Sequence, residues 1–396
     1  MSAQSRPSSA PRVLTPRRAE PADSMRPTRA EISLGHLRHN LSYLRRITGA
    51  PVWSVLKADA YGHGSKAVAR TLERAGSAGV CVALVEEAIE LREAGILVPI
   101  LVLGGTYKNA LAELLEYQLT PVVSHVDQLA ELAEEARFAG VPPIPIHVKL
   151  DTGMARLGVP PSAWSSFAAA LAGCPEVRLD AAMTHFACAE SDPASVAAQL
   201  ARFGEACEAL RAEGVEVPRR HAANTAAALG HPEARLDMVR PGIGLFGMAP
   251  GVTPVPELKP AMRVRTQIVS LRDLPVGASV GYGATWTARR GSRIATIPMG
   301  YGDGLSRALS NRGHVLVRGR RAPMIGIISM DLTSVDVTDI PGAELGDEVV
   351  VLGSQRGPLG YDLLHPEEIA RLSGTIAWEV LTAISRRVPR FYREEI

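Results

Sequence analysis

Several residue types are scarce in this 396-residue chain, and each scarcity excludes a class of protein. Four cysteines without a CxxC pair are too few for a disulfide scaffold and favour a reducing compartment. No uninterrupted apolar run approaches the roughly 18–20 residues that a membrane span needs. The formal net charge is only +2, which gives no indication of nucleic-acid or membrane binding. We therefore expect a soluble, cytoplasmic protein of about two domains.

Lysine is the most informative scarcity. Only five of the 43 basic side chains are lysines, at Lys57, Lys66, Lys108, Lys149 and Lys259. Arginine supplies positive charge by default here, whereas only a primary amine forms a Schiff base or is carbamylated. Each lysine is therefore a candidate for a chemical role, although a surface lysine that only carries charge is the ordinary alternative.

The composition changes along the chain and predicts three segments. Residues 1–28 are rich in Ser, Pro and Arg and are predicted to be a disordered leader; a transit peptide is a second interpretation, against which the prolines argue. Residues 29–258 alternate apolar runs with helix-period stretches, about eight times in about 220 residues, which predicts a (β/α)8 barrel. A doubly wound open sheet is the second choice. The expected strands are Val52–Leu56, Val80–Leu84, Pro99–Leu103, Thr120–Val123, Ile144–Leu150, Val177–Thr184, Arg219–Ala222 and Met238–Gly242.

Residues 259–396 have a different texture. Short β-branched runs are separated by Gly, Asp and Pro, which predicts a mainly-β domain after the Pro-rich linker near 250–262. The expected strands are Arg263–Arg272, Ser292–Ile297, His314–Val317, Met324–Ile328, Thr333–Val337 and Glu348–Gly353, with helices near Pro366–Leu372 and Ala377–Ile384.

Two familiar patterns occur in the wrong context. GIGLFG at 242–247 fits the dinucleotide fingerprint but precedes a Pro-rich linker, and GASVG at 277–281 fits a nucleophile elbow but lies among strands. The chain also has no HExxH motif, Walker loop or clustered Cys/His set, so no metal site is expected.

Three other segments place chemistry at the ends of predicted barrel strands, where such barrels carry their active sites. LKADAYGHG, residues 56–64, puts Lys57 at a strand end before a glycine-punctuated loop. HVKLDTGMARLG, residues 147–158, clusters Lys149, Asp151 and Arg156, for which a structural salt-bridge network is the alternative. HAANTAAA, residues 221–228, together with DMVRPGIGLFG, residues 237–247, predicts a phosphate cradle, with tight packing of small residues as the alternative.

Taken together, these segments resemble alanine racemase, a family of fold-type III pyridoxal-phosphate enzymes with a barrel and a C-terminal β domain. The resemblance runs from about Arg26 to the end of the chain. Its motifs occur in the family's order: LKADAYGHG, KLDTGMARLG, THFA, HAANTAA, DMVRPGIGLFG, VGYGATW, PMGYGDG, SMDLTSVDVT and ISRRVPR.

The resemblance implies roles for individual residues. Lys57 would be the Schiff-base lysine and one racemising base, and Tyr282 would be the opposing base from the other subunit, which implies a homodimer. Arg240 would contact the pyridine nitrogen, and His185 would link Arg240 to Tyr282. The remaining cofactor residues would be Tyr61, Asn224, Thr225, Gly242, Ile243 and Arg386. The substrate residues would be Arg156, Met330, Tyr301 and Lys149, of which Lys149 matches a lysine that is often carbamylated.

The chemistry is consistent with these residue types. Racemisation removes a proton from one face of Cα and returns one to the other face, so two bases must flank the cofactor. The resemblance thus implies an amino-acid isomerase that converts L-alanine to D-alanine and supplies peptidoglycan synthesis.

One departure leaves the substrate open. The family usually has a tyrosine where ISRRVPR has Arg386, so serine or another amino acid with a larger side chain is an alternative substrate. A decarboxylase of the same fold type, a non-catalytic pyridoxal-phosphate carrier and a paralogue that has lost activity are further alternatives. The decarboxylases generally carry a cysteine in the C-terminal half, whereas all four cysteines here precede residue 208.

Overall fold

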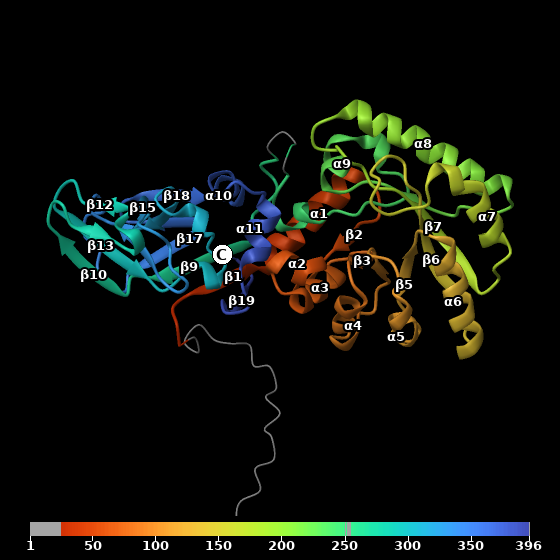
Figure 1. Cartoon of the computed structure of the whole chain (residues 1–396), viewed down its shortest axis with the longest axis horizontal. Coiled ribbons are helices and arrows are strands. Elements are labelled where there is room, and N and C mark those ends of the chain that lie inside the picture. Colours follow the sequence, from red (N-terminus) through yellow and green to blue (C-terminus); the bar gives the residue numbers. More distant parts are fainter. Residues whose placement is uncertain (1–24, 250, 252–254, 396) are drawn as a thin grey trace, which may run out of the picture.

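The computed structural model describes residues 25–249, 251 and 255–395, which form two lobes (Figure 1). The predicted leader falls largely outside these residues. Its last part does not: Thr28 is fully buried and Arg26 pairs with Asp303, so residues 26–28 are packed against the β lobe. Among the described residues, no helix combines the length and the apolar character needed to cross a bilayer.

The barrel lobe contains a seven-stranded parallel sheet in sequential order. Its strands are β2 (Trp53–Val55), β3 (Gly79–Val82), β4 (Ile100–Val102), β5 (Thr120–Val123), β6 (Ile144–Lys149), β7 (Val177–Met183) and β8 (Arg220–His221). Most strand residues are buried, as expected for parallel strands covered on both faces. An eighth segment closes the ring, because Arg240 N donates to Ala223 O while Trp53 N and Val55 N donate to Val239 O and Pro241 O. The barrel predicted from the sequence is confirmed.

Helices surround this sheet (Figure 1). They are α1 (Leu34–Thr48), α2 (Lys57–Gly62), α3 (Ser65–Arg74), α4 (Val85–Glu93), α5 (Leu111–Glu116), α6 (Val126–Ala139), α7 (Trp164–Ala172), α8 (Pro193–Ala212) and α9 (Thr225–Gly230). Local sequence sets several of their ends. Asp192 accepts from Ser195 N before Pro193 opens α8, and Gly140 ends α6 with a φ of 63°.

The second lobe is built on a ten-stranded sheet, which confirms the mainly-β prediction. Its strands are β1 (Arg29–Ser33), β9 (Met262–Gln267), β10 (Ser270–Leu274), β13 (Ser292–Ile297), β14 (His314–Val317), β15 (Arg320–Ile325), β16 (Thr333–Asp336), β17 (Glu348–Gly357), β18 (Gly360–Leu364) and β19 (Arg390–Arg393). A separate hairpin joins β11 (Ser279–Val280) to β12 (Trp286–Thr287). Helix α11 (Ala377–Ala383) packs against α2 of the barrel, and α10 (Pro366–Ser373) packs against α11 and residues 307–309 of the β lobe.

Two predictions about this lobe differ from the structure. Residues 29–33 are predicted to start the barrel, but β1 pairs with β9 and β19, so the chain passes through the β lobe before it enters the barrel. The single strand predicted over residues 263–272 is two strands, because Val264 pairs with β1 and β17 whereas Arg272 pairs with β13.

Candidate active site

A cavity of about 380 Å³ opens at the carboxyl ends of the barrel strands. This size suits a small cofactor and substrate. Ten of the residues singled out from the sequence line it: Lys57, Tyr61, Lys149, Arg156, His185, Asn224, Thr225, Arg240, Gly242 and Ile243. They come from segments up to 186 positions apart in the sequence, and the barrel topology brings them to one face.

Lys57 enters the cavity from a left-handed turn. Ala58, Asp59, Ala60 and Tyr61 all have φ of 53°, although α2 is otherwise a helix by its hydrogen bonds. Four consecutive non-glycine residues in this region are strained, and such strain is found where surrounding contacts impose it. The turn puts the Lys57 and Tyr61 side chains into the same cavity.

The cavity wall is strongly cationic. Lys57, Lys149, Arg156 and Arg240 line it, and the Lys57, Lys149 and Arg156 side chains have no hydrogen-bond or ion-pair partner among the described residues. Burial and the neighbouring Arg156 lower the pKa of Lys57, and the same causes lower the pKa of Lys149 to about 8. Unpaired cations that face a cavity favour an anionic ligand.

Arg240 is buried and is held without a carboxylate. Its guanidinium donates to Thr184 O at 2.9 Å, to Ala222 O at 3.0 Å and to the His221 ring at Nδ1. Burial lowers its pKa to about 10, so it stays charged near neutral pH. The Nε–H has no partner among the described residues and is free to meet an acceptor.

The contact with Arg240 fixes the protons on two buried histidines. His221 Nδ1 accepts from the guanidinium, so its proton lies on Nε2, which donates to His147 Nδ1 at 3.0 Å. Burial lowers the pKa of His221 well below its ordinary value and that of His147 to about 3. Both rings are therefore neutral, so Arg240 carries the charge in this series of three hydrogen-bonded side chains. His185 lines the cavity nearby, and burial and Arg240 lower its pKa to about 3.

Two hydroxyl groups are positioned to bind an anion in the cavity. Thr225 Oγ1 accepts from Gly242 N at 3.1 Å and from Gly244 N at 3.2 Å, so its own hydrogen is left for another acceptor. The Tyr61 hydroxyl has no partner among the described residues. A Cβ at Gly242 would lie 2.2 Å from the Tyr61 oxygen, so this close approach requires glycine.

The candidate residues of the β lobe do not line this cavity. Tyr282 is 74% exposed, Met330 is 52% exposed and Tyr301 is 43% exposed. Tyr282 lies between β11 and β12. Two backbone hydrogen bonds join the loops that carry Tyr301 and Met330: Tyr301 N donates to Ser329 O, and Gly302 N donates to Met330 O.

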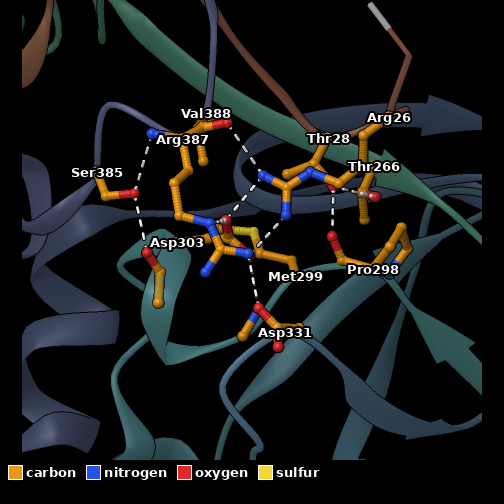
Figure 2. A network of polar contacts seen from close by, with 12 residues as sticks. Arg26, Thr28, Thr266, Pro298, Met299, Asp303, Asp331, Ser385, Arg387 and Val388 are labelled. Atoms are coloured by element: carbon orange, nitrogen blue, oxygen red, sulfur yellow. Dashed lines mark hydrogen bonds and ion pairs between the residues drawn. The ribbon is translucent and has the colours of Figure 1, made fainter.

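A network of ion pairs fixes those two loops (Figure 2). The Asp303 carboxylate is fully buried and accepts from both terminal nitrogens of Arg26, at 2.7 and 3.0 Å. Arg387 contacts Asp303 at 3.5 Å and Asp331 at 2.6 Å. The network thereby joins the turn that follows Tyr301, the loop that carries Met330 and the segment next to Arg386.

Arg386 lines a second cavity, of about 360 Å³, instead of the first. Its neighbours there include Ala58, Asp59 and Glu87, on the other side of the left-handed turn. Tyr61 and Thr225 line the first cavity and Arg386 does not, so the position of Arg386 gives no support to the expectation that it contacts the cofactor phosphate.

Several residues of the site are not among those predicted. Glu190 and Trp378 line the main cavity, His221 accepts from Arg240, and His147 accepts from His221. His221 and His147 open the motifs HAANTAAA and HVKLDTG, so their position at strand ends was the available signal. Trp378 belongs to α11, and nothing local in the sequence connects it with the barrel.

Comparison with known proteins identifies relatives along the whole described chain. The family model for the alanine racemase N-terminal domain matches residues 32–250, and that for the alanine racemase C-terminal domain matches residues 261–392. An alanine racemase of Sorangium cellulosum is 57% identical over 378 residues, which cover 93% of this chain and 100% of the relative.

Solved structures agree with this result. The alanine racemase from Streptomyces coelicolor A3(2) is 36% identical with a TM-score of 0.88, over 94% of this chain and 100% of that chain. The biosynthetic alanine racemase from Pseudomonas aeruginosa is 37% identical with a TM-score of 0.81, over 93% and 100%. The two domain matches, the close relatives and the shared two-lobed fold show that this chain belongs to the alanine racemase family.

Proposed function

We propose that this chain is a pyridoxal-phosphate-dependent racemase that interconverts L-alanine and D-alanine. The observation that carries the proposal is the main cavity, where the side chains of Lys57, Lys149 and Arg156 face the same space without a partner among the described residues. A primary amine beside a cationic wall suits a cofactor with an aldehyde and a phosphate, and a substrate with a carboxylate.

The residues present fit this cofactor. The Tyr61 hydroxyl and the free hydrogen of Thr225 would bind the phosphate, with Asn224, Gly242 and Ile243 beside them. The free Nε–H of Arg240 would donate to the pyridine nitrogen, and Lys57 Nζ would hold the aldehyde carbon. When bound, pyridoxal phosphate supplies the electron sink that makes a proton on the substrate Cα acidic.

The side chains of the cavity also divide the work on the substrate. Arg156 binds the carboxylate, next to Lys149. Lys57 moves a proton on one face of Cα, and Tyr282 of the partner subunit moves a proton on the opposite face. His185, which lies in the field of Arg240, would link that tyrosine to the arginine.

Exposure of the β-lobe residues supports a homodimer. Tyr282, Tyr301 and Met330 are large side chains that lie at the surface of their own chain and do not line its cavity. In a two-fold dimer the same patch on each copy meets the partner, so each β lobe would complete the other copy's cavity.

The alternatives differ in how well they fit. A match to the C-terminal racemase domain favours a racemase over a carrier without a β lobe. A larger substrate such as serine remains the second candidate. Arg386 stands where the family usually has a tyrosine, and it lines the second cavity, so no tyrosine at this position lies beside the phosphate cradle. We also propose the cytoplasm as the site of action, since the four cysteines are free thiols, and peptidoglycan synthesis as the use of D-alanine.

Proton NMR in heavy water tests the proposal. The cofactor-loaded protein is mixed with L-alanine or L-serine, and loss of the Cα–H signal is followed together with chiral analysis. We expect exchange and D-enantiomer formation on L-alanine. Exchange confined to L-serine would replace the substrate, and no exchange with either amino acid would contradict racemisation.

A further inference from the structure

Glu87 makes three hydrogen bonds that join two barrel strand ends. Its Oε1 accepts from Ala58 N at 2.6 Å, and its Oε2 accepts from Ala83 N at 2.8 Å and from Leu84 N at 3.2 Å. Ala58 follows Lys57 beyond β2, and Ala83 follows β3. One carboxylate on α4 therefore ties the residue after Lys57 to the neighbouring strand.

The segment that Glu87 holds is the strained one. Ala58 is the first of the four residues with φ of 53°, and it is exposed, so packing does not hold it in place. The other end of the turn has its own supports: Asp59 accepts from Ser65 N, and Arg390 donates to Gly62 O. At the Lys57 end, the hydrogen bond from Ala58 N to Glu87 Oε1 gives the backbone of the turn its side-chain support.

Glu87 also acts on the charge of Lys57. The groups that act on Lys57 are Arg156, which disfavours its protonated form, and Glu87, which favours it. On the second cavity, Glu87 faces Asp59, Glu90, Arg386 and Arg390. Its carboxylate thus raises the pKa of Lys57, against burial and Arg156, which lower it.

We propose that Glu87 is a positioning residue that holds the left-handed turn so that Lys57 points into the main cavity. The inference rests on the proposed function only in naming pyridoxal phosphate as the ligand of Lys57. A role limited to capping α4 is the competing explanation, because the bond to Leu84 N is half of a capping box.

Replacing Glu87 with glutamine separates these roles. Glutamine is also a capping-box residue and keeps one acceptor oxygen, which can serve Leu84 N. The amide oxygen is expected at the Oε2 position, where it serves two donors, Ala83 N and Leu84 N. The NH2 group then faces Ala58 N and cannot accept, so Ala58 N loses its partner. Glu86→Gln is the matched control, since Glu86 lies in the same first turn of α4 but is exposed and makes no hydrogen bond with a described residue.

The first readout is the dissociation constant of pyridoxal phosphate, measured by titrating the apoprotein and following cofactor absorbance. We expect Glu87→Gln to weaken binding by on the order of 10-fold, as loss of a hydrogen bond to a charged group does, and Glu86→Gln to leave it unchanged. Addition of Ala58→Gly to Glu87→Gln should recover part of the loss, because glycine adopts positive φ without strain. Unchanged binding in Glu87→Gln, or a loss that Ala58→Gly does not reduce, would overturn the proposal.

The second readout needs neither cofactor nor a stable variant. Hydrogen exchange of the unchanged apoprotein, resolved to single amides, should be slow at Ala58 although this residue is exposed. Exchange at the rate of an unstructured chain would contradict the proposal. If the unchanged protein fails to bind pyridoxal phosphate, the proposed function fails, while exchange at Ala58 still tests the hydrogen bond to Glu87.

Discussion

At the scale of the residue, the main cavity uses burial and like charges to change the chemistry of its amines. Lys149 is buried, and burial together with Arg156 and Arg240 lowers its pKa to about 8. A lysine with its ordinary pKa is almost entirely protonated near neutral pH, whereas a fraction of Lys149 is neutral there. Only the neutral amine reacts with carbon dioxide, and the product replaces a positive charge beside Arg156 with a negative one.

We therefore predict that Lys149 is carbamylated in bicarbonate. The neutral amine becomes more abundant as pH rises, and the lowered pKa of about 8 places this change near neutral pH. The carbamate signal should therefore increase from about pH 7 to about pH 9. Carbon-13 NMR with labelled bicarbonate measures it. Lys149→Arg should remove the signal and Lys66→Arg, at an exposed lysine paired with Glu90, should not. A signal that survives Lys149→Arg would contradict this account.

The sequence identified the residues of the cavity better than the contacts that hold them. Lys57, Arg156 and Arg240 stand in recognisable motifs at strand ends. Glu87 lies in an ordinary helical stretch, and its bond to Ala58 spans 29 positions. Such contacts depend on how neighbouring strands align in the sheet, which local patterns do not encode.

At the scale of the element, two loops of the β lobe depend on a buried carboxylate. Asp303 is fully buried between Arg26 and Arg387, and it also accepts from Gly300 N at 3.1 Å (Figure 2). Removing one partner of a buried ion pair leaves the other charge without compensation.

Asp303→Asn should therefore lower the free energy of unfolding by roughly 3 kcal/mol, measured by denaturant titration. The matched control is Asp339→Asn. Asp339 is 78% exposed and its partner Arg290 is 57% exposed, so this substitution should leave stability nearly unchanged. Equal effects of the two substitutions would show that burial of Asp303 does not matter.

Elements formed by local periodicity were predicted well, and those formed by distant pairing were not. The expected strands Thr120–Val123, Ser292–Ile297 and His314–Val317 coincide with β5, β13 and β14. β1 and β19 pair in parallel across about 360 positions and were missed. Their short runs are recognised as strands only through the partners that they find in the fold.

At the scale of the whole molecule, the main cavity lies on the barrel lobe. Tyr282, Tyr301 and Met330 of the β lobe are exposed and do not line it. β1 and β19 pair side by side in the β lobe, so both ends of the described chain are anchored there (Figure 1). In the proposed dimer, Tyr282 of one copy works with Lys57 of the other.

Complementation between two inactive variants tests this claim most directly. Lys57→Ala and Tyr282→Phe chains are co-expressed with different affinity tags, and the hybrid dimer is purified through both tags. In a dimer with shared sites, one site of the hybrid has both bases and the other has neither, so the hybrid should show about half of the unchanged activity while each parent is inactive. A hybrid as inactive as its parents would contradict the account.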